Sequence, residues 1–282
     1  MFAAAILLAG AAGCATTGGD SRDPFEGFNR SMYGFNQTID EAVLKPVSTA
    51  YKENLPEMVQ TGVRNFFSNI ADIFISVNNL LQGKVVEAAN DGMRFAVNTT
   101  IGGLGLLDWA SEMGLEKHNE DFGQTFGRWG VEDGPYIVWP LLGSSNVRDS
   151  VGTILDIHYD PVGNHKPVTA RNAMLATRLV SRRADLLDAS RILEEAALDK
   201  YVFERDAYIQ RRRNLIYDGN PPRDSRPRSD STQRTAPLAE SNDGPAPESR
   251  PAGVSYSPQV PRNYEAIMSA SVLGTQRHVA GR

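Results

Sequence analysis

The chain has 282 residues and a formal net charge of −5, with 41% hydrophobic and 22% charged residues. This charge gives no support to binding of nucleic acid or another polyanion. Cys14 is the only cysteine, which excludes an intrachain disulfide. The stretch 23–218 is long enough for one domain with a sizeable core.

The N-terminus carries an export signal. Residues 1–13, MFAAAILLAGAAG, are apolar and small, typical of a secretory signal peptide and too short to span a bilayer. The sequence Ala-Ala-Gly before Cys14 resembles the lipobox of bacterial lipoproteins. We therefore predict that Cys14 is lipidated, that 14–22 form a lipidated linker, and that several acyl chains hold the protein on a membrane.

The lipobox departs from the usual pattern in two ways. Ala11 stands where leucine is usual, and no Lys or Arg precedes the apolar run. The missing basic residues suggest that translation starts upstream, and an ordinary signal with an accidental cysteine is the alternative. Ala15 follows the cysteine in place of Asp, which by the bacterial sorting rule favours the outer membrane.

The first part of the domain is predicted to be helical. Apolar residues from Phe25 to Ile39 recur every three or four positions, and Pro24 suits a first helical turn behind an Asp23 cap. Pro46 and Pro56 are predicted to bracket a short extended connector.

A second helix, beginning at Glu57, has two contrasting faces. One is an apolar stripe of Val63, Phe66, Phe67, Ile70, Phe74, Val77 and Leu81. The other holds Asn65, Ser68, Asn69, Asp72, Ser76, Asn78 and Asn79. A water-facing helix normally carries many Lys and Glu, so this pattern indicates a helix between lipid and a polar channel. A core helix buried on most sides, with asparagines that cap turns, explains it equally well.

A third helix is predicted over 84–98, followed by a glycine-rich bend into another short apolar helix. The bend contains Gly102, Gly103 and Gly105. These glycines lack the spacing and the Lys-Ser/Thr pair of a phosphate-binding loop. Close-packed backbone is the favoured interpretation.

The most unusual stretch is 120–152, EDFGQTFGRWGVEDGPYIVWPLLGSSNVRDSVG. It mixes aromatic residues, including Trp129, Tyr136 and Trp139, with closely spaced glycines. Gly123 and Gly127 are four apart and would clear one helix face for close packing. Pro140 argues against a core strand, so 136–142 is predicted as a loop or broken element on an apolar partner. A buried aromatic loop of a soluble protein is the alternative.

The last part of the chain has a different character. Residues 169–213 are typical of water-facing amphipathic helix, predicted as two segments that break near 188–190. Residues 219–282 contain more than half of the 16 prolines and are predicted to be disordered, apart from a short contact segment at 264–273. The tail is either a weakly basic tether or, preferably, an inert extension.

No catalytic constellation is evident. The four histidines form no HExxH motif, and GxSxG is absent. Alternate residues Asp156, His158 and Asp160 could bind a cation from one side, but a turn before Pro161 is the simpler explanation. Arg148 and Asp149 are expected to cap or pair at a helix start. No cofactor and no metal are predicted.

Several motifs together resemble one family. They are DPFEGFNRSMYGFN from Asp23, NNLLQG from Asn78, RFAVNTTIGGLGLLDWA from Arg94, the segment from Glu120 through SSNVRDSVG, and RDAYIQRR from Arg205. The chain resembles the MlaA (VacJ) lipoproteins of the Gram-negative outer membrane over roughly 23–218. It departs at Phe25, Ile73 and Lys200, where leucine, proline and Asp-Pro-Tyr are common, and in its long tail.

This resemblance implies an all-α fold, a ring-like helical domain embedded in the inner leaflet of the outer membrane with a central amphipathic pore, followed by the disordered tail. It also implies a non-enzymatic function, in which phospholipids misplaced in the outer leaflet pass through the pore to a soluble periplasmic carrier. Trimeric porins are the implied partners, and the periplasmic face of the outer membrane is the implied location.

Candidate pore or lipid-contact residues are Phe66, Phe67, Ile70, Phe74, Gly102, Gly103, Gly105, Gly123, Gly127, Trp129, Tyr136 and Trp139. A bulky residue at Gly127 is expected to impair lipid asymmetry while the protein stays folded. A structural lipoprotein that scaffolds porins remains the alternative, and an outer-membrane lipid hydrolase would need a nucleophile or metal site that the sequence does not show.

Overall fold

The computed structural model describes residues 20–222. Cys14, the predicted signal peptide and the predicted contact segment 264–273 lie outside the described residues. The helices are α2 (Glu26–Ile39), the π-helical turn η1 (Asp40–Leu44), α3 (Lys45–Asn54), α4 (Glu57–Leu81), α5 (Val85–Thr100), α6 (Trp109–Glu112), α7 (Phe122–Arg128), α8 (Val147–Tyr159), α9 (Val168–Asp185), α10 (Leu187–Ala196) and α11 (Lys200–Ile216). The two strands described, β1 (Tyr136–Trp139) and β2 (Gly143–Asn146), pair antiparallel.

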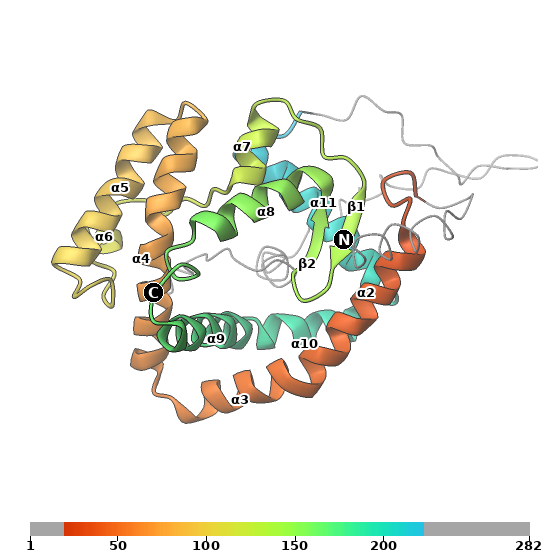
Figure 1. Cartoon of the computed structure of the whole chain (residues 1–282), viewed down its shortest axis with the longest axis horizontal. Coiled ribbons are helices and arrows are strands. Elements are labelled where there is room, and N and C mark those ends of the chain that lie inside the picture. Colours follow the sequence, from red (N-terminus) through yellow and green to blue (C-terminus); the bar gives the residue numbers. More distant parts are fainter. Residues whose placement is uncertain (1–19, 223–282) are drawn as a thin grey trace, which may run out of the picture.

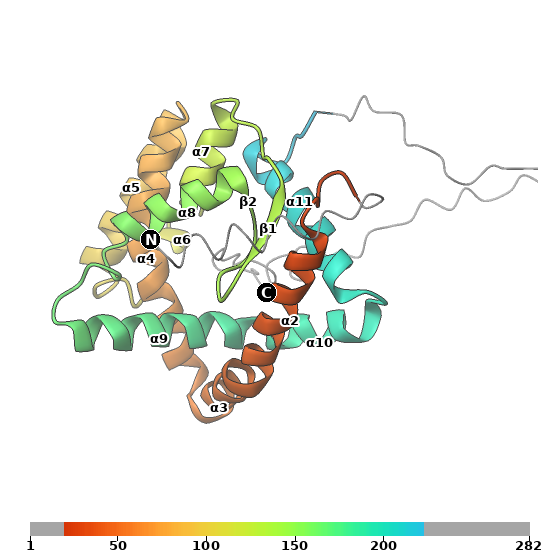
Figure 2. The ribbon, with the colours of Figure 1, turned by 45° about the vertical axis from the view of Figure 1, so that its right-hand side comes forward.

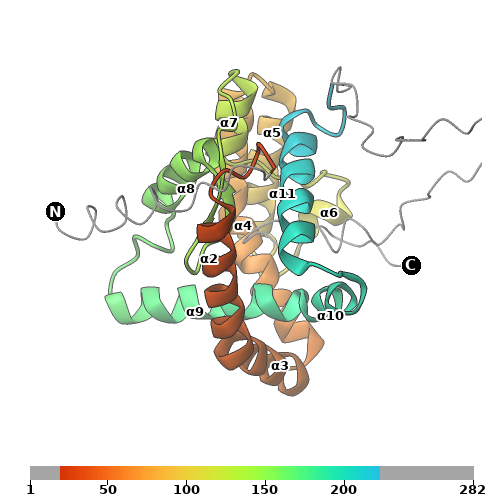
Figure 3. The same cartoon turned by 90° about the vertical axis from the view of Figure 1, so that its right-hand side faces the viewer.

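The helices follow one another around a ring (Figure 1). α2, η1, α3 and α4 trace one continuous curve along the outside, and α5 and α6 lie outside α4. α9 and α10 run across the base of this curve, where α9 packs on α3 and α4, while α7, α8 and the β-hairpin close the opposite side (Figure 2). α11 stands beside α2 and packs on α7 and β2 (Figure 3).

The first helix begins later than predicted. α2 starts at Glu26 behind Phe25, and no side chain caps it. Asp23 is not a helix cap. It is 2% exposed, and its carboxylate accepts hydrogen bonds from Asn29 and Tyr201, so it joins α2 to α11.

The predicted extended connector between Pro46 and Pro56 is wrong. The chain stays helical from Glu26 to Asn54 through the π-helical turn, and Pro46 is in the first turn of α3, where a missing N–H is tolerated. Only the dipeptide before α4 is extended, with Leu55 in the β region.

The late helices also differ in number from the prediction. The break falls at Leu186, and a second break at 197–199 separates α10 from α11, so three helices replace the two expected. By contrast, the predicted starts near Glu57 and Lys84 and the short helix after the glycine bend are confirmed within one or two residues.

The apolar core of the domain is small. Tyr136, Val138, Tyr201 and Tyr208 form it, with Met32, Tyr33, Val202 and Ile209 packed around them. Their rings meet edge to face or tilted, with centroids 5.8–6.3 Å apart. This core fastens β1 between α2 and α11. Elsewhere in 20–222 more polar than apolar side chains are buried.

None of the helices described is both long and apolar enough to cross a membrane.

Candidate functional site

A buried polar seam joins α4 to its neighbours. The Asn79 amide donates to Asp91 Oδ2 at 2.8 Å, and Thr125 Oγ1 of α7 donates to Asn78 Oδ1 at 2.7 Å. Asn69, Asn78 and Asn79 are at most 3% exposed. The interpretation that this face borders an open polar channel is therefore wrong for these three residues. The structure shows the alternative, a helix whose asparagines are buried and hydrogen-bonded.

Arg94 on α5 is the centre of this seam. Its Nη2 lies 3.0 Å from both carboxylate oxygens of Asp108, and its Nε lies 3.7 Å from Asp72 Oδ2. Asp72 also pairs with Lys117, on the segment that leads to α7. Asn98 donates to Asp108 Oδ1 at 2.9 Å. A guanidinium that is 1% exposed thus holds two carboxylates from distant parts of the chain.

The glycine-rich bend packs by its backbone. A Cβ at Gly102 would lie 2.2 Å from the Leu107 carbonyl oxygen, and one at Gly105 would lie 2.6 Å from the Asn69 side chain. Gly105 also has φ +87°, which L-residues rarely adopt. Gly103 is exposed and meets nothing within 4 Å. The prediction of close-packed backbone is confirmed for Gly102 and Gly105.

The exposed side chains of the same region are largely apolar. Those of α4–α6 and their loops that are at least 41% exposed include Val77, Leu80, Leu81, Val85, Val86, Met93, Ile101, Leu104, Leu106, Leu107, Trp109 and Met113. On α8, Val147, Val151, Ile154 and Ile157 are at least half exposed. Polar groups inside and aliphatic groups outside reverse the arrangement of a water-soluble helix.

A second polar hub lies where α7, α8 and α11 meet. Arg212 Nη1 lies 2.6 Å from Asp121 Oδ2, and its Nε lies 2.8 Å from Asp149 Oδ2. Arg148 reaches Asp149 Oδ1 at 2.9 Å, so the expected pairing of Arg148 with Asp149 is confirmed. Despite burial, Arg212 and the Gln124 hydrogen bonds hold the pKa of Asp121 well below its usual range.

Two glycines bring α7 and α8 together. A Cβ on Gly152 would lie 2.4 Å from the Gly123 nitrogen, so these helices touch by their backbones. A Cβ on Gly127 would lie 2.8 Å from Ile216 and 3.1 Å from Arg148. The predicted close packing is confirmed. A bulky residue at Gly127 meets α11 directly, and we expect it to disturb packing first.

The β-hairpin is fixed to α2 by two asparagines, seven residues apart. Asn29 donates to Tyr136 O at 3.1 Å and accepts from Val138 N at 2.8 Å. Asn36 donates to Trp139 O at 2.9 Å and accepts from Leu141 N at 2.7 Å. Each amide matches one backbone N–H and one C=O of the hairpin, as a neighbouring strand would. The predicted loop at 136–142 is therefore a hairpin, with Pro140 in its turn and not in a core strand.

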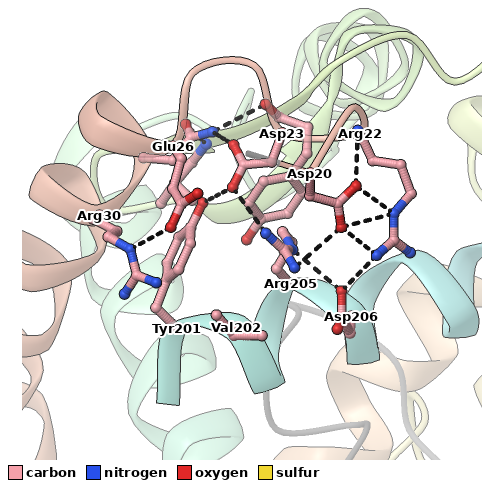
Figure 4. Close-up of polar contacts among 12 residues, drawn as sticks. Asp20, Arg22, Asp23, Glu26, Arg30, Tyr201, Val202, Arg205 and Asp206 are labelled. Carbon is pink, nitrogen blue, oxygen red and sulfur yellow. Dashed lines mark hydrogen bonds and ion pairs between the residues drawn. The ribbon is translucent and has the colours of Figure 1, made fainter. Parts of the chain in front are cut away.

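The start of the described chain is held against α11 (Figure 4). Arg205 lies 3.2 Å from Asp20 and 3.4 Å from Asp23, and Arg22 reaches Asp206 at 3.1 Å. The Arg22 carbonyl also accepts a hydrogen bond from Tyr136 N at 2.9 Å. The end of the predicted linker is thus part of the folded domain.

The remaining candidate residues lie on different elements, and some are buried while others are exposed. Phe67 is buried, while Phe66, Ile70 and Phe74 are partly exposed on α4. Tyr136 belongs to the apolar core. Trp129 is 56% exposed and donates to Leu81 O, and Trp139 donates to Ser150 Oγ.

The predicted alternation of Asp156, His158 and Asp160 does not occur. The first two lie on helix α8, where residues two apart point in different directions. Asp156 accepts from Phe122 N, and Asp160 pairs with Arg178 at 2.6 Å. Residues 20–222 contain no group of three or more His, Cys, Asp or Glu side chains placed to hold a metal ion.

Sequence reasoning missed Arg94, Arg212, Asn29 and Asn36. Each is a polar residue on the inward face of an amphipathic helix. Their position on that face is the only feature of the sequence that could have identified them, and it does not indicate which residue each one contacts.

Comparison with known proteins decides the family. The family model described as MlaA lipoprotein matches residues 21–215. The chain belongs to the MlaA lipoprotein family. Intermembrane phospholipid transport system lipoproteins MlaA of Escherichia coli and Shigella flexneri are each 34% identical over 206 residues, or 71% of this chain and 81% of theirs. The Haemophilus influenzae protein of the same name is 30% identical over 205 residues, or 71% of this chain and 81% of its own.

A solved structure agrees with the fold. It comes from work on the structural basis for maintenance of bacterial outer membrane lipid asymmetry, and it superposes with a TM-score of 0.61 at 32% identity. The superposition covers 70% of this chain and 99% of that one. The mostly helical MlaA architecture predicted from the sequence is thereby confirmed.

Proposed function

We propose that this protein is a non-enzymatic outer-membrane lipoprotein that removes mislocalised phospholipids from the outer leaflet. In this proposal the ring of helices sits in the inner leaflet and lipids pass through its amphipathic centre to a soluble periplasmic carrier. The lipid asymmetry of the outer membrane is thereby maintained. Trimeric porins are the proposed neighbours within the membrane, and Cys14 is the proposed anchor.

The observation that carries the proposal is the reversed burial in α4–α6 and α8. An exposed aliphatic surface of this extent is unfavourable in water and favourable against acyl chains. Behind it, the buried seam pairs many of its polar groups within the protein, such as Asn79 with Asp91 and Arg94 with Asp108. Relatives named for intermembrane phospholipid transport supply the substrate class.

The contacts of Asp20, Arg22 and Asp23 with α11 support a fixed position of the domain relative to the bilayer. Asp20 is held on α11, and it follows Cys14 by six positions. A chain of six residues reaches at most about 20 Å. A lipidated Cys14 would therefore keep Asp20, and with it the part of α11 around Arg205, within about 20 Å of the membrane surface.

The direct test is reconstitution of lipid transfer. The lipidated protein is placed in vesicles with a labelled glycerophospholipid, the periplasmic carrier is added, and lipid on the carrier is identified by mass. Intact phospholipid that appears only when the protein is present is the expected result. Lyso-lipid or free fatty acid would make the protein an enzyme and refute the proposal.

Arg191→Gln is a matched control, because it changes an exposed side chain on α10 and is expected to leave transfer unchanged. Addition of a porin trimer separates transport from scaffolding. If no lipid moves even with a porin trimer present, the porin scaffold is the better explanation.

A further inference from the structure

Helix α9 carries an arginine, Arg182, that has neither an ion pair nor a hydrogen bond among the described residues, whereas Arg171 at least donates to Asn172. Three of its charged side chains have close partners: Arg183 with Asp40 at 2.7 Å, Asp185 with Arg64 at 2.6 Å, and Arg178 with Asp160 at 2.6 Å. Arg182 is partly buried and makes no hydrogen bond or ion pair within residues 20–222.

The surroundings of Arg182 make this unusual. Burial, together with the neighbouring Arg178 guanidinium, lowers its pKa to about 10, so the side chain is still charged at neutral pH. A partly buried charge without a partner is costly, and buried guanidinium groups are normally paired. The site therefore has a positive charge and free N–H donors to offer.

The direction of this face follows from the contacts of α9. Ser181 and Ala184 are buried, and Ser48 of α3 bonds to Val180 O at 3.2 Å, so this side packs on α3. Arg178, four residues before Arg182, reaches Asp160 just beyond the end of α8. In Figures 1 and 2, α9 lies between α3 and α8. Arg178 and Arg182 share the face that is turned to α8.

The charge balance favours an anion. Arg178 and Arg182 carry two positive charges, and Asp160 is the one carboxylate that acts on Arg182. Arg178 uses only Nη2 in its contact with Asp160. An anion between the two arginines would accept a fork of hydrogen bonds from Arg182 and one more from Arg178. Phosphate oxygens match guanidinium geometry in this way.

The neighbours on this face are apolar. Leu179 and Leu175 lie three and seven residues before Arg182, which places them on the same side of the helix. Ile157 and Tyr159 at the end of α8 are 55% exposed. A charged group beside aliphatic surface suits a molecule with a phosphate and an acyl chain better than a free ion.

We propose that Arg182, assisted by Arg178, binds the phosphate of a glycerophospholipid on the α8-facing side of α9. This rests on the proposed function for its substrate class. The arginines hold the head group by charge-assisted hydrogen bonds, and the leucines of α9 contact the first part of the acyl chains. One net positive charge keeps the contact weak enough for release.

The test compares lipids with and without the phosphate. Binding of dihexanoyl phosphatidylglycerol and of dihexanoylglycerol to the purified full-length protein is measured by native mass spectrometry. Arg182→Gln is expected to raise the Kd for phosphatidylglycerol about tenfold, the effect of losing a charge-assisted pair. Arg182→Lys keeps the charge without the fork and is expected to lie between the two. Dihexanoylglycerol binding stays unchanged.

Arg191→Gln is the matched control, because it removes the same charge from an exposed position on α10. Phosphatidylglycerol binding by Arg182→Gln within about twofold of wild type would overturn the proposal, as would equal losses for both lipids. The Tm of Arg182→Gln without lipid is expected to equal or exceed that of wild type. A clear fall in that Tm together with retained lipid binding would mark Arg182 as structural.

Two further measurements are needed. The first distinguishes a lipid phosphate from free phosphate, and the second distinguishes failure of the Arg182 site from failure of the proposed function. Inorganic phosphate, compared with chloride at equal ionic strength, is expected not to displace phosphatidylglycerol, and displacement at millimolar concentration would refute the lipid assignment. If wild type transfers lipid to the carrier and Arg182→Gln binds and transfers equally well, the site fails and the function stands. If wild type binds through Arg182 but transfers nothing, the function fails and the site stands.

Discussion

The α4–α6 region and the pair of helices α9 and α10 solve the same packing problem in opposite ways. α4 and α5 bury asparagines, aspartates and Arg94, and leave aliphatic side chains exposed. α9 and α10 direct charged residues such as Asp188 and Arg191 to the surface, and pair others with η1 and α3. Both regions are amphipathic, so periodicity alone does not tell which face is inside.

The largest loss of stability is expected from substitution of Arg94, the centre of the polar seam. Arg94→Met takes from Asp108 its cation and leaves Asp72 with Lys117 alone, and we expect the free energy of unfolding to fall by about 3–5 kcal/mol. Chemical denaturation of the purified protein measures it. Arg191→Gln, on the charged side of the molecule, is expected to change it by less than about 0.5 kcal/mol. Similar losses of unfolding free energy in the two variants would contradict the contrast between the buried polar seam and the charged surface of α10.

The backbone contact between α7 and α8 gives the next largest effect. Gly152→Ala places a Cβ 2.4 Å from the Gly123 nitrogen, which neither helix backbone can avoid without moving. A loss of about 2–3 kcal/mol is expected. Gly34→Ala in α2, which meets nothing within 4 Å, is expected to stabilise the protein by about 0.5–1 kcal/mol. Thermal unfolding of both variants checks the sign of each change.

The asparagines of α2 test whether the hairpin is held from one side. Asn29 is fully buried, so Asn29→Ala is expected to cost about 2 kcal/mol, and Asn36→Ala about 1 kcal/mol because Asn36 is only partly buried. Hydrogen exchange should accelerate at Val138 and Leu141, whose N–H groups donate to these side chains. Unchanged exchange there would mean that the hairpin is held by the tyrosine core alone.

The smallest expected effect is a dependence of Tm on pH, caused by Glu204 on α11. Burial raises its pKa to about 7, although Ser144 donates a hydrogen bond to it. A carboxyl whose pKa is raised in the folded state favours folding most below its unfolded pKa. This contribution is lost as pH rises through about 7, so Tm is expected to fall between about pH 5.5 and pH 8.

We expect a fall of about 2–4 °C, the shift that about 1 kcal/mol produces in a domain of this size. Glu204→Gln keeps an acceptor for Ser144 and should flatten most of this slope. Asp156, whose pKa burial also raises to about 7, contributes in the same direction. An unchanged slope in Glu204→Gln would assign the effect elsewhere.

Sequence patterns anticipated the helical fold and much of its close packing. Apolar repeats placed α4 and α5, and glycines four apart predicted the close packing of α7. They failed at Pro46, because proline in a first helical turn and proline in an extended segment look alike locally. They also failed at Pro140, because a hairpin turn tolerates a proline that a strand does not.

The candidate site was predicted less well than the fold. Trp129, Gly102 and Gly127 were noticed because their residue types are unusual, whereas Arg212 and Asn29 are ordinary residues in amphipathic helices. Their importance depends on Asp149 and β1, which are 63 and 109 residues away in the chain. One sequence does not specify such pairings.

The sequence by itself determined that the chain is mostly helical, where α4 and α5 begin, where backbones approach closely and to which family the chain belongs, because these follow from local residue type and order. The tertiary structure decided which face of α4 is buried, which carboxylate each arginine meets, and why Arg182 on α9 lacks a close carboxylate within the described residues. These depend on neighbours distant in the chain, whose free energy of contact outweighs local preference.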